Sequence, residues 1–548
     1  MHRLLLALVA CTLPTSRVLG AEPPVVSPPK LVTCQRLVHA ADEPGNWLMY
    51  SGTYNGQRHS RLRQIDDTNV HKLRVKWVRQ FPTLSWVETT PLVVDGVMYA
   101  TVPPNEVKAL DARTGMEYWY RIHPNAAKLC LCCGKVNRGV AILGEKLYMG
   151  TLDAQLLAID CRMGRKRWLD DHVIVADCEK GHSITAAPLI VKDMVVTGIA
   201  GGEFGIRGFL AAYDAKTGKE RWRRPTIPGP GEPGNETWAG DSWKTGGAPT
   251  WMTGTYDPEL NLIYWGVGNP GPDYNGEVRQ GDNLYSDSVL ALDADTGRIK
   301  WYFQFTPHDV WDWDSCQIPV LVDVPFRGKP RKLMLFANRN AFFYVLDRET
   351  GEFLLARAFA KQTWADGIDK KGRPKVRPDK LPSKDGTLVY PDVSGAANWW
   401  SPSYSPQTGL FYQLAFDGAC KYVIGEPEPE PGTGKPYVGG GGMASEYLPF
   451  PDSSYFSAVR ALRVETGEIV WEYRVEPKSS AGLLSTAGNL VFGGTAKGVF
   501  FALNATTGKE LWRLDLGARV HAAPISYTVD GKQYVTIAAG NALFTFGL

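Results

Sequence analysis

An all-β fold, an eight-bladed β-propeller, is predicted by three features of the sequence: its composition, a repeated strand–turn–strand phrase, and the spacing of that phrase. The 548 residues include 57 Gly, 38 Pro and 18 Trp, as expected for short strands joined by many tight turns. Most copies of the phrase are separated by about 40 to 55 residues, the length of a four-stranded propeller blade.

Each copy of the phrase consists of an apolar pair, an Asp-like turn opener, Thr-Gly and a charged stretch that ends in an aromatic residue. The copies read ALDARTGMEYW from Ala109, AIDCRMGRKRW from Ala158, AYDAKTGKERW from Ala212, ALDADTGRIKW from Ala291, VLDRETGEFLL from Val345, ALRVETGEIVW from Ala461 and ALNATTGKELW from Ala502. The glycine accepts a positive φ in a tight turn between two strands. The terminal Trp is expected to pack against the neighbouring unit, as in tryptophan-docking repeats.

Two gaps in this series are longer than the others. The gap after Gly218 contains TYDPELNLIYWG, and the gap after Gly351 contains SYSPQTGLFYQ. Each can hold another blade plus loop excursions, and eight is the resulting count. The stretch EPEPEPGTGKP from Glu426 is expected to be a solvated loop rather than a linker, so residues 22–548 are predicted to form a single closed domain.

The N-terminus has the pattern of a cleaved secretory signal. Arg3 precedes an apolar run from Leu4 to Cys11, and small residues close the segment at Gly20 and Ala21. Residues 1–21 are therefore expected to be removed. A lipoprotein cleavage box ending at Cys11 is an alternative, and a buried first strand or helix is another. No later segment approaches the roughly 20 apolar residues needed to cross a bilayer, so the mature protein is expected to be soluble and periplasmic or otherwise exported.

Charge and cysteine content exclude several classes of function. Lys and Arg exceed Asp and Glu by 60 to 57, a net +3, which indicates no nucleic-acid partner. Eight cysteines lie beyond the signal, and disulfides are permitted in an exported protein. The residues around Cys130 do not form the Cys-x-x-Cys-His motif of covalent haem attachment. Electrons from any redox reaction are therefore expected to leave to a separate acceptor.

Several polar residues lie outside the repeated phrase and are candidates for a site on the propeller axis. Adjacent Cys132 and Cys133 can form a vicinal disulfide, remain as thiols, or pair with cysteines elsewhere. Glu203, Asn269 and Asp312 come from separate loops, and oxygen ligands of this kind suit a hard cation such as calcium. Taken singly, each is equally consistent with a turn or capping role.

Eight ordered segments resemble the pyrroloquinoline quinone (PQQ) dependent alcohol dehydrogenases, a family that includes methanol dehydrogenase large subunits. The segments are NWLMYSGTYNGQRHSRLRQIDDTNVHKL from Asn46, CCGKVNRG from Cys132, ITAAPLIVKD from Ile184, GGAPTWMTGTYDP from Gly246, GVGNPG from Gly266, TPHDVWDWD from Thr306, STAGNLVFGG from Ser485 and DGKQYVTIAAG from Asp530. The resemblance runs nearly end to end and implies PQQ-dependent oxidation of an alcohol to an aldehyde or ketone.

The resemblance also implies which residues contact the cofactor. The quinone would lie between Trp251 and a Cys132–Cys133 disulfide. Its rim would be contacted by the residues at the matching positions: Glu88, Arg138, Thr185, Ala200, Gly201, Gly202, Arg339 and Asn398. Arg138 and Arg339 suit an acceptor that carries carboxylates and quinone oxygens.

One metal ion is implied beside the quinone, held by Glu203, Asn269 and Asp312. Asp312 would be the general base that takes the alcohol proton, and Arg339 would stabilise charge on the reduced quinone. Calcium members of the family usually carry a small neutral residue two positions after the base, whereas lanthanide members carry a carboxylate. Asp314 stands there, which favours a lanthanide(III) ion over calcium.

Other expectations concern partners and alternatives. The substrate is expected to be a small alcohol, and the acceptor a soluble, cytochrome c-like protein. Ala200 stands where a serine is common, and Ala481–Gly482 replaces a segment that often carries a Trp, so methanol itself is in doubt. The oligomeric state is left open, with a homodimer as one option. The alternative function is a non-catalytic periplasmic propeller that acts as a binding or assembly scaffold.

Overall fold

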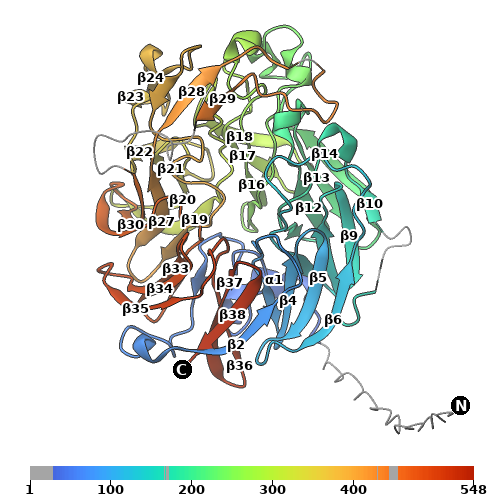
Figure 1. Cartoon of the computed structure of the whole chain (residues 1–548), viewed down its shortest axis with the longest axis vertical. Coiled ribbons are helices and arrows are strands. Elements are labelled where there is room, and N and C mark those ends of the chain that lie inside the picture. Colours follow the sequence, from blue (N-terminus) through green and yellow to red (C-terminus); the bar gives the residue numbers. More distant parts are fainter. Residues whose placement is uncertain (1–28, 166, 168–171, 429, 444–454) are drawn as a thin grey trace, which may run out of the picture.

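Short antiparallel strands joined by tight turns form ten sheets in the described chain, and eight of these sheets are arranged in a ring around a central axis (Figure 1). The structure, a computed structural model, describes residues 29–165, 167, 172–428, 430–443 and 455–548. The expected signal peptide, residues 1–21, lies outside these ranges. The predicted all-β propeller with eight blades is confirmed.

Seven blades follow the chain in order, each with its first strand innermost. The first four blades are β3(Leu92–Val94), β4(Val97–Val102), β5(Glu106–Asp111) and β6(Glu117–Ile122); β7(Ala141–Leu143), β8(Lys146–Gly150), β9(Gln155–Asp160) and β10(His172–Ile174); β11(Leu189–Val191), β12(Met194–Gly198), β13(Phe209–Asp214) and β14(Glu220–Pro225); β15(Thr255–Asp257), β16(Leu262–Gly266), β17(Ser288–Asp293) and β18(Ile299–Gln304). The next three are β19(Val320–Phe326), β20(Lys329–Ala337), β21(Phe342–Asp347) and β22(Phe353–Ala358); β26(Ser403–Ser405), β27(Leu410–Asp417), β30(Phe456–Arg463) and β31(Ile469–Val475); β32(Leu484–Thr486), β33(Leu490–Gly494), β34(Val499–Asn504) and β35(Glu510–Asp515), with β1(His59–Ser60) added beside β32.

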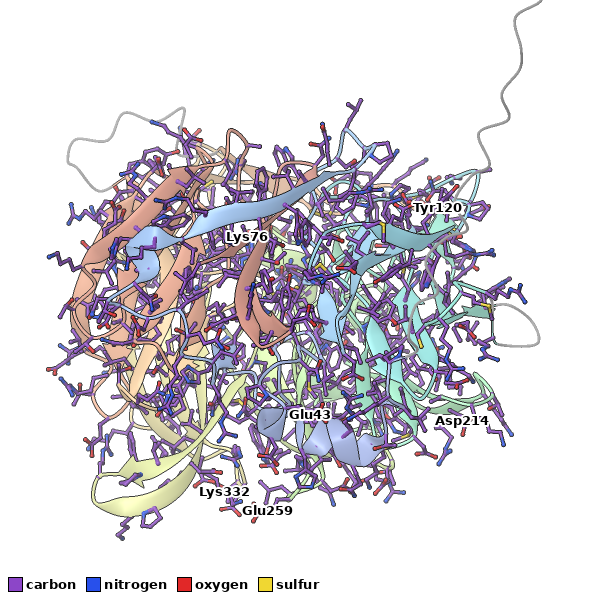
Figure 2. All side chains as sticks on the ribbon, turned by 90° about the horizontal axis from the view of Figure 1, so that it is seen from below. Glu43, Lys76, Tyr120, Asp214, Glu259 and Lys332 are labelled. Atoms are coloured by element: carbon purple, nitrogen blue, oxygen red, sulfur yellow. A yellow bond between two sulfur atoms is a disulfide. The ribbon has the colours of Figure 1, made fainter. Side chains whose placement is uncertain are left out.

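The eighth blade joins the two ends of the described chain. Its inner strands are β36(Ile525–Val529), β37(Lys532–Ala539) and β38(Ala542–Gly547), and its outer strand is β2(Arg74–Gln80), which pairs antiparallel with β38. Figure 2 shows Lys76 on β2, and its Nζ donates to the main-chain oxygen of Leu548 at 2.6 Å. This pairing closes the ring.

The long gaps in the repeat series do not contain extra blades, so that expectation was wrong. TYDPELNLIYWG forms β15 and β16, the inner hairpin of the blade whose outer turn carries Gly297. SYSPQTGLFYQ forms the β26–β27 hairpin of the blade that carries Gly467. The gap after Gly351 also holds two small sheets outside the blades, formed by β23(Ala365–Ile368) with β24(Pro374–Val376), and by β25(Thr387–Val389), β28(Cys420–Ile424) and β29(Gly440–Met443). The predicted number of eight blades is nevertheless correct. Seven blades each carry one copy of the repeated phrase, and the closing blade is an eighth that carries none.

The repeated Trp packs on the turn glycine of the next blade, as the sequence predicted. Trp222 is 8% exposed and covers Gly297 so closely that a Cβ there would lie 2.5 Å from its ring. The Trp222 indole Nε1 donates to the carbonyl of Ala294 at 3.1 Å. Trp77 over Gly115 and Trp471 over Gly508 repeat the arrangement. These three junctions are each fixed by one ring and one hydrogen bond, whereas the indole Nε1 atoms of Trp119 and Trp301 have no partner in the described chain and Gly467 is covered by Arg357.

The described residues contain no helix that is long and apolar enough to cross a membrane. The only α-helix among them is α1(Cys34–Val38), which Thr33 caps by accepting from the backbone N–H of Arg36.

Candidate active site

The predicted site residues gather at one end of the propeller because of where they fall in the blades. Glu88, Arg138, Thr185, Trp251, Asp312, Asp314 and Asn398 each precede the innermost strand of a blade, and six blades contribute. Ala200 to Glu203, Asn269 and Arg339 lie between the second and third strands of their blades. Both kinds of connection lie at the same end of an antiparallel four-stranded sheet. The Thr-Gly turns, between third and fourth strands, lie at the opposite end.

These connections enclose a cavity of about 330 Å³ on the axis. Its lining includes thirteen of the predicted residues: Glu88, Cys132, Cys133, Arg138, Thr185, Ala200, Gly201, Glu203, Trp251, Asp312, Asp314, Arg339 and Asn398. The other two are adjacent. Gly202 lies between the lining residues Gly201 and Glu203, and the backbone N–H of Asn269 donates to Asp314 Oδ1 at 2.9 Å.

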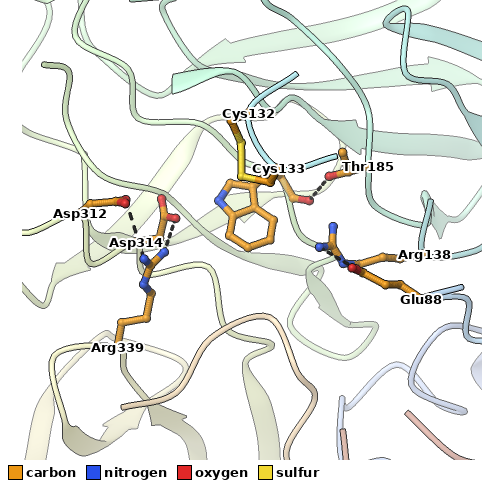
Figure 3. Close-up of a disulfide and its surroundings, with 9 residues drawn as sticks. Glu88, Cys132, Cys133, Arg138, Thr185, Asp312, Asp314 and Arg339 are labelled. Carbon is orange, nitrogen blue, oxygen red and sulfur yellow. Dashed lines mark hydrogen bonds and ion pairs between the residues drawn. A yellow bond between two sulfur atoms is a disulfide. The ribbon is translucent and has the colours of Figure 1, made fainter. Parts of the chain in front are cut away.

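Cys132 and Cys133 are bonded to each other in a disulfide. The alternatives in which these two residues stay as thiols or pair elsewhere are therefore excluded. Both are exposed to the cavity, and a carboxylate oxygen of Glu203 lies within 4.8 Å of the two sulfur atoms. Figure 3 shows the disulfide between the Glu88–Arg138 pair and the group formed by Asp312, Asp314 and Arg339.

Arg138 is held among acidic and aromatic groups on one side of the cavity. Its Nη2 lies 3.0 Å from Glu88 Oε2, and both side chains are at most 10% exposed. The guanidinium carbon lies 5.2 Å from the ring centroid of Trp251 and 4.8 Å from that of Trp399, within the range of cation–π attraction. Thr185 Oγ1 donates to the carbonyl of Trp251 at 3.1 Å, which fixes the backbone that presents this ring.

The segment HDVWDWD places its two tryptophans on the opposite side from Asp312 and Asp314. Trp311 and Trp313 are buried and stacked, with ring centroids 4.8 Å apart. Asp309 fixes this turn, because its carboxylate accepts the backbone N–H groups of Trp311 and Trp313. Asp312, with φ of +59°, is thereby directed into the cavity.

Arg339 lies against the carboxylates of this segment. Its Nη1 donates to Asp314 Oδ2 at 2.5 Å, and its Nη2 lies 3.8 Å from Asp312 Oδ1. The Arg339 and Asp314 side chains are 6% and 8% exposed, whereas Asp312 is 24% exposed toward the cavity. A bound molecule therefore meets Asp312 first.

Burial raises the pKa of the acids that face the cavity. Burial and, to a smaller extent, the neighbouring Asp314 carboxylate raise the pKa of Glu203 to about 7. Burial also raises the pKa of Asp312 well above its usual range, although Arg339 opposes the shift. Carboxylates with raised pKa values are those expected of a proton acceptor or of a cation site.

Sequence reasoning missed four polar or aromatic residues that belong to this region: Ser183, Asp273, Ser394 and Trp399. Ser183, Ser394 and Trp399 line the cavity. Asp273 is 2% exposed, and its Oδ1 accepts from Asn269 Nδ2 at 3.0 Å. Trp399 follows Asn398 and Asp273 follows GVGNPGP, so proximity to a predicted residue was the only signal for either.

The cavity fits a flat anionic cofactor and a hard cation. Among the described residues, several buried polar atoms that face it have no hydrogen-bond partner: Arg138 Nε and Nη1, Arg339 Nε and Glu203 Oε2. Buried polar groups normally have partners, so the unpaired guanidinium N–H groups suit quinone or carboxylate oxygens, and the unpaired carboxylate oxygen suits a metal. Trp251 and the disulfide supply flat, apolar surface.

A family model described as glucose/ethanol/alcohol dehydrogenase, β-propeller domain, and labelled PQQ, matches residues 47–358. The chain belongs to the PQQ-dependent alcohol dehydrogenase family. A second model, described as outer membrane protein assembly factor BamB, matches residues 456–546 and is confined to the last blades.

Individual relatives of this PQQ-dependent dehydrogenase cover most of both chains. The chain is 41% identical to the quinohemoprotein alcohol dehydrogenase ADH-IIG of Pseudomonas putida, over 93% of this chain and 74% of that protein. The chain is 37% identical to the lanthanide-dependent methanol dehydrogenase of Methylacidiphilum fumariolicum, over 92% of this chain and 86% of that protein. A solved europium-containing methanol dehydrogenase superimposes with a TM-score of 0.87 at 34% identity, covering 94% of this chain and all of that one.

Proposed function

We propose that this enzyme oxidises a small alcohol with PQQ and one metal ion, both held in the axial cavity, and that Asp312 is its general base. The observation that carries this proposal is the gathering of the predicted residues from six blades around one cavity whose buried polar atoms lack partners. A scaffold propeller has no need of buried polar atoms without hydrogen-bond partners, which are costly to retain.

The predicted cofactor residues fall into two groups, one for the faces of the quinone and one for its edge. Trp251 and the Cys132–Cys133 disulfide would cover the faces of the quinone and exclude water from it. Glu88, Arg138, Thr185, Ala200, Gly201, Gly202, Arg339 and Asn398 would contact its edge. When bound, the quinone would accept one hydride, which carries two electrons, from the carbinol carbon, and the cation would polarise the accepting carbonyl.

Asp312 is the carboxylate best placed for the remaining proton. It is the more exposed of the two cavity aspartates, and its raised pKa makes it a stronger base than an ordinary aspartate. Arg339, paired with Asp314, would remain a cation throughout and would stabilise negative charge beside the base. The alcohol thus loses its hydroxyl proton to Asp312.

Glu203, Asn269, Asp312 and Asp314 would supply oxygen ligands to the metal. We favour a lanthanide(III) ion because Asp314 adds a carboxylate to this set, and calcium is the alternative. The names of two relatives, one lanthanide-dependent and one europium-containing, support this choice. Export to the periplasm after removal of residues 1–21, and electron transfer to a soluble cytochrome c-like acceptor, complete the proposal.

Reconstitution of the purified, metal-free protein tests the function. We expect uptake of PQQ with a change in its absorption spectrum, followed by dye reduction with primary or secondary alcohols. No quinone uptake with calcium or lanthanum would refute the cofactor assignment. Full activity with calcium alone would refute the lanthanide assignment.

A matched pair of variants separates the two ions. Asp314→Ala is expected to lower activity with lanthanum more than activity with calcium, because it removes a carboxylate while leaving Glu203 and Asp312 in place. Asp295→Ala, an exposed aspartate paired with Lys192, is the control and should leave both activities unchanged.

A further inference from the structure

Asp273 is a buried carboxylate that the proposed function does not use. It lies in the connection between β16 and β17, four residues after Asn269, and it is 2% exposed. Its Oδ1 accepts from Asn269 Nδ2 at 3.0 Å, and Asn269 is itself 4% exposed. Burial of a carboxylate costs several kcal/mol in general unless other groups compensate the charge, so its position requires an explanation.

The contact with Asp273 decides which way the Asn269 amide faces. The Asn269 NH₂ group points to Asp273, because Nδ2 is the atom that donates to Asp273 Oδ1. The backbone N–H of Asn269 is held by Asp314 Oδ1 at 2.9 Å. With both N–H groups committed to carboxylates, Asn269 Oδ1 is the atom left to meet a hard cation.

Asp273 also adds a carboxylate next to the residues that line the cavity. Glu203, Asp273, Asp312 and Asp314 face one free guanidinium, that of Arg339, because the other guanidinium of the cavity, Arg138, is paired with Glu88. Four negative charges against one positive charge leave an excess of three when all are ionised.

A second buried arginine lies nearby but is committed to other groups. The Arg279 guanidinium donates to the carbonyls of Pro272, Asp273 and Asp309 and to the side-chain oxygen of Asn283. It therefore holds the backbone of the loop that carries Asp273 and makes no hydrogen bond to the Asp273 carboxylate in the described chain.

We propose that Asp273 is a positioning and specificity-determining residue for the metal ion: it turns Asn269 Oδ1 toward the ion and adds the negative charge that favours a trivalent over a divalent cation. The inference rests on the proposed function, because it assigns a role toward the metal placed there. It differs from the role of Asp314, since Asp314 holds the Asn269 backbone and Arg339, whereas Asp273 holds the Asn269 side chain.

Two substitutions separate the two parts of this role. Asp273→Asn keeps an oxygen that can accept from Asn269 Nδ2 but removes the charge. Asp273→Ala removes both. Glu277→Gln is the matched control, because it removes one negative charge from an exposed residue of the same loop.

The measurement is isothermal titration calorimetry of the full-length, PQQ-loaded, metal-free protein with La³⁺ and with Ca²⁺. We expect Asp273→Asn to weaken La³⁺ binding by about 10- to 100-fold and Ca²⁺ binding less, so that the ratio of the two affinities falls. We expect Asp273→Ala to weaken both, and Glu277→Gln to change neither.

A wild-type affinity ratio in Asp273→Asn would overturn the charge role, and wild-type affinities for both ions in Asp273→Ala would overturn the positioning role. Thermal unfolding shows whether Asp273→Ala folds. If it does not fold, the isosteric Asp273→Asn decides alone, and unchanged binding of both ions by that variant would overturn the inference. If the wild-type protein binds neither ion, the proposed function fails. If the wild type binds metal and the variants behave like it, only the inference fails.

Discussion

The outer strands and the axial connections of this propeller are built on opposite principles. At the perimeter, Trp222 covers a glycine of the next blade and its one polar atom has a partner. On the axis, Glu203, Arg138 and Arg339 are buried with polar atoms that have no partner. The Trp222 contact is complete without any ligand, whereas the axis reaches low free energy only when charges from outside the chain are added.

Stability and chemistry therefore depend on different residues of this propeller. Perimeter contacts recur from blade to blade, so a change in one should act on folding and spare the reaction. Axial residues occur once each, so a change there should act on the reaction and spare folding, or even improve it.

The largest effect is expected for Asp312→Asn. Loss of the proton acceptor should lower turnover with alcohol by about 10²- to 10⁴-fold, while the melting temperature stays unchanged or rises because a repelled, buried carboxylate is removed. Dye-coupled kinetics and thermal unfolding measure the two quantities. Asp530→Asn, in an exposed ion pair with Arg113, is the control. Near-wild-type turnover in Asp312→Asn would remove Asp312 from the mechanism.

At the perimeter, Trp222→Ala should show the reverse pattern. Loss of this buried ring should lower the free energy of unfolding by about 3–5 kcal/mol, with kcat of the folded protein unchanged. Denaturant unfolding and kinetics on the same sample test this. Tyr302→Ala, on the adjacent blade with a side chain that is 41% exposed, should lose much less. A fall in kcat as large as that of Asp312→Asn would contradict the separation of the two regions.

Glu203 contributes to the pH dependence of the metal-free protein, together with other buried acids such as Asp312. Its folded-state pKa, about 7, is raised above the ordinary 4.5 by burial. A raised carboxyl pKa contributes stability that is fully present below pH 4.5 and is lost as pH rises to about 7. The loss amounts to at most about 3 kcal/mol. Glu203→Gln should remove this part of the pH dependence, and unfolding curves between pH 4.5 and 8 would reveal it. Identical curves for the two proteins would contradict the shift.

The smallest effect is expected for Gly297→Ala. A methyl group there would lie 2.5 Å from the Trp222 ring at a φ of +66°, and overpacking of this kind costs about 1–3 kcal/mol. Gly531→Ala is a matched control, because that glycine has a φ of +70° but open space around its Cβ position. The difference between the two variants isolates the ring contact from backbone strain. Equal losses of stability in the two variants would show that the Trp222 ring moves aside at little cost.

The same contrast explains how far the sequence could predict the structure. Repeated turns such as those at Gly115 and Gly508 predict blades because each copy meets the same neighbours. The closing blade escaped this reasoning: β2 and β38 lie at opposite ends of the chain, and their pairing carries no repeated signal. Ring closure, rather than a blade within a gap, accounts for the count of eight.

The site could be predicted only in part, and chiefly through the family resemblance. Asp312 and Arg138 belong to motifs that the resemblance covers, and both line the cavity. Asp273 and Trp399 make contacts that no local sequence pattern specifies. The pairing of Asp273 with Asn269 depends on a fold of the connecting loop that Arg279 stabilises from within.

The pairing of β2 with β38 also determines when the ring can close. Arg74 at the start of β2 is opposite Gly547 at the end of β38, so the first outer strand stays unpartnered until nearly the whole chain is available. Such a distant contact makes the last step of assembly slow and leaves an open sheet edge in the meantime. Closure of the ring is therefore expected to be the last and slowest step in the assembly of this propeller.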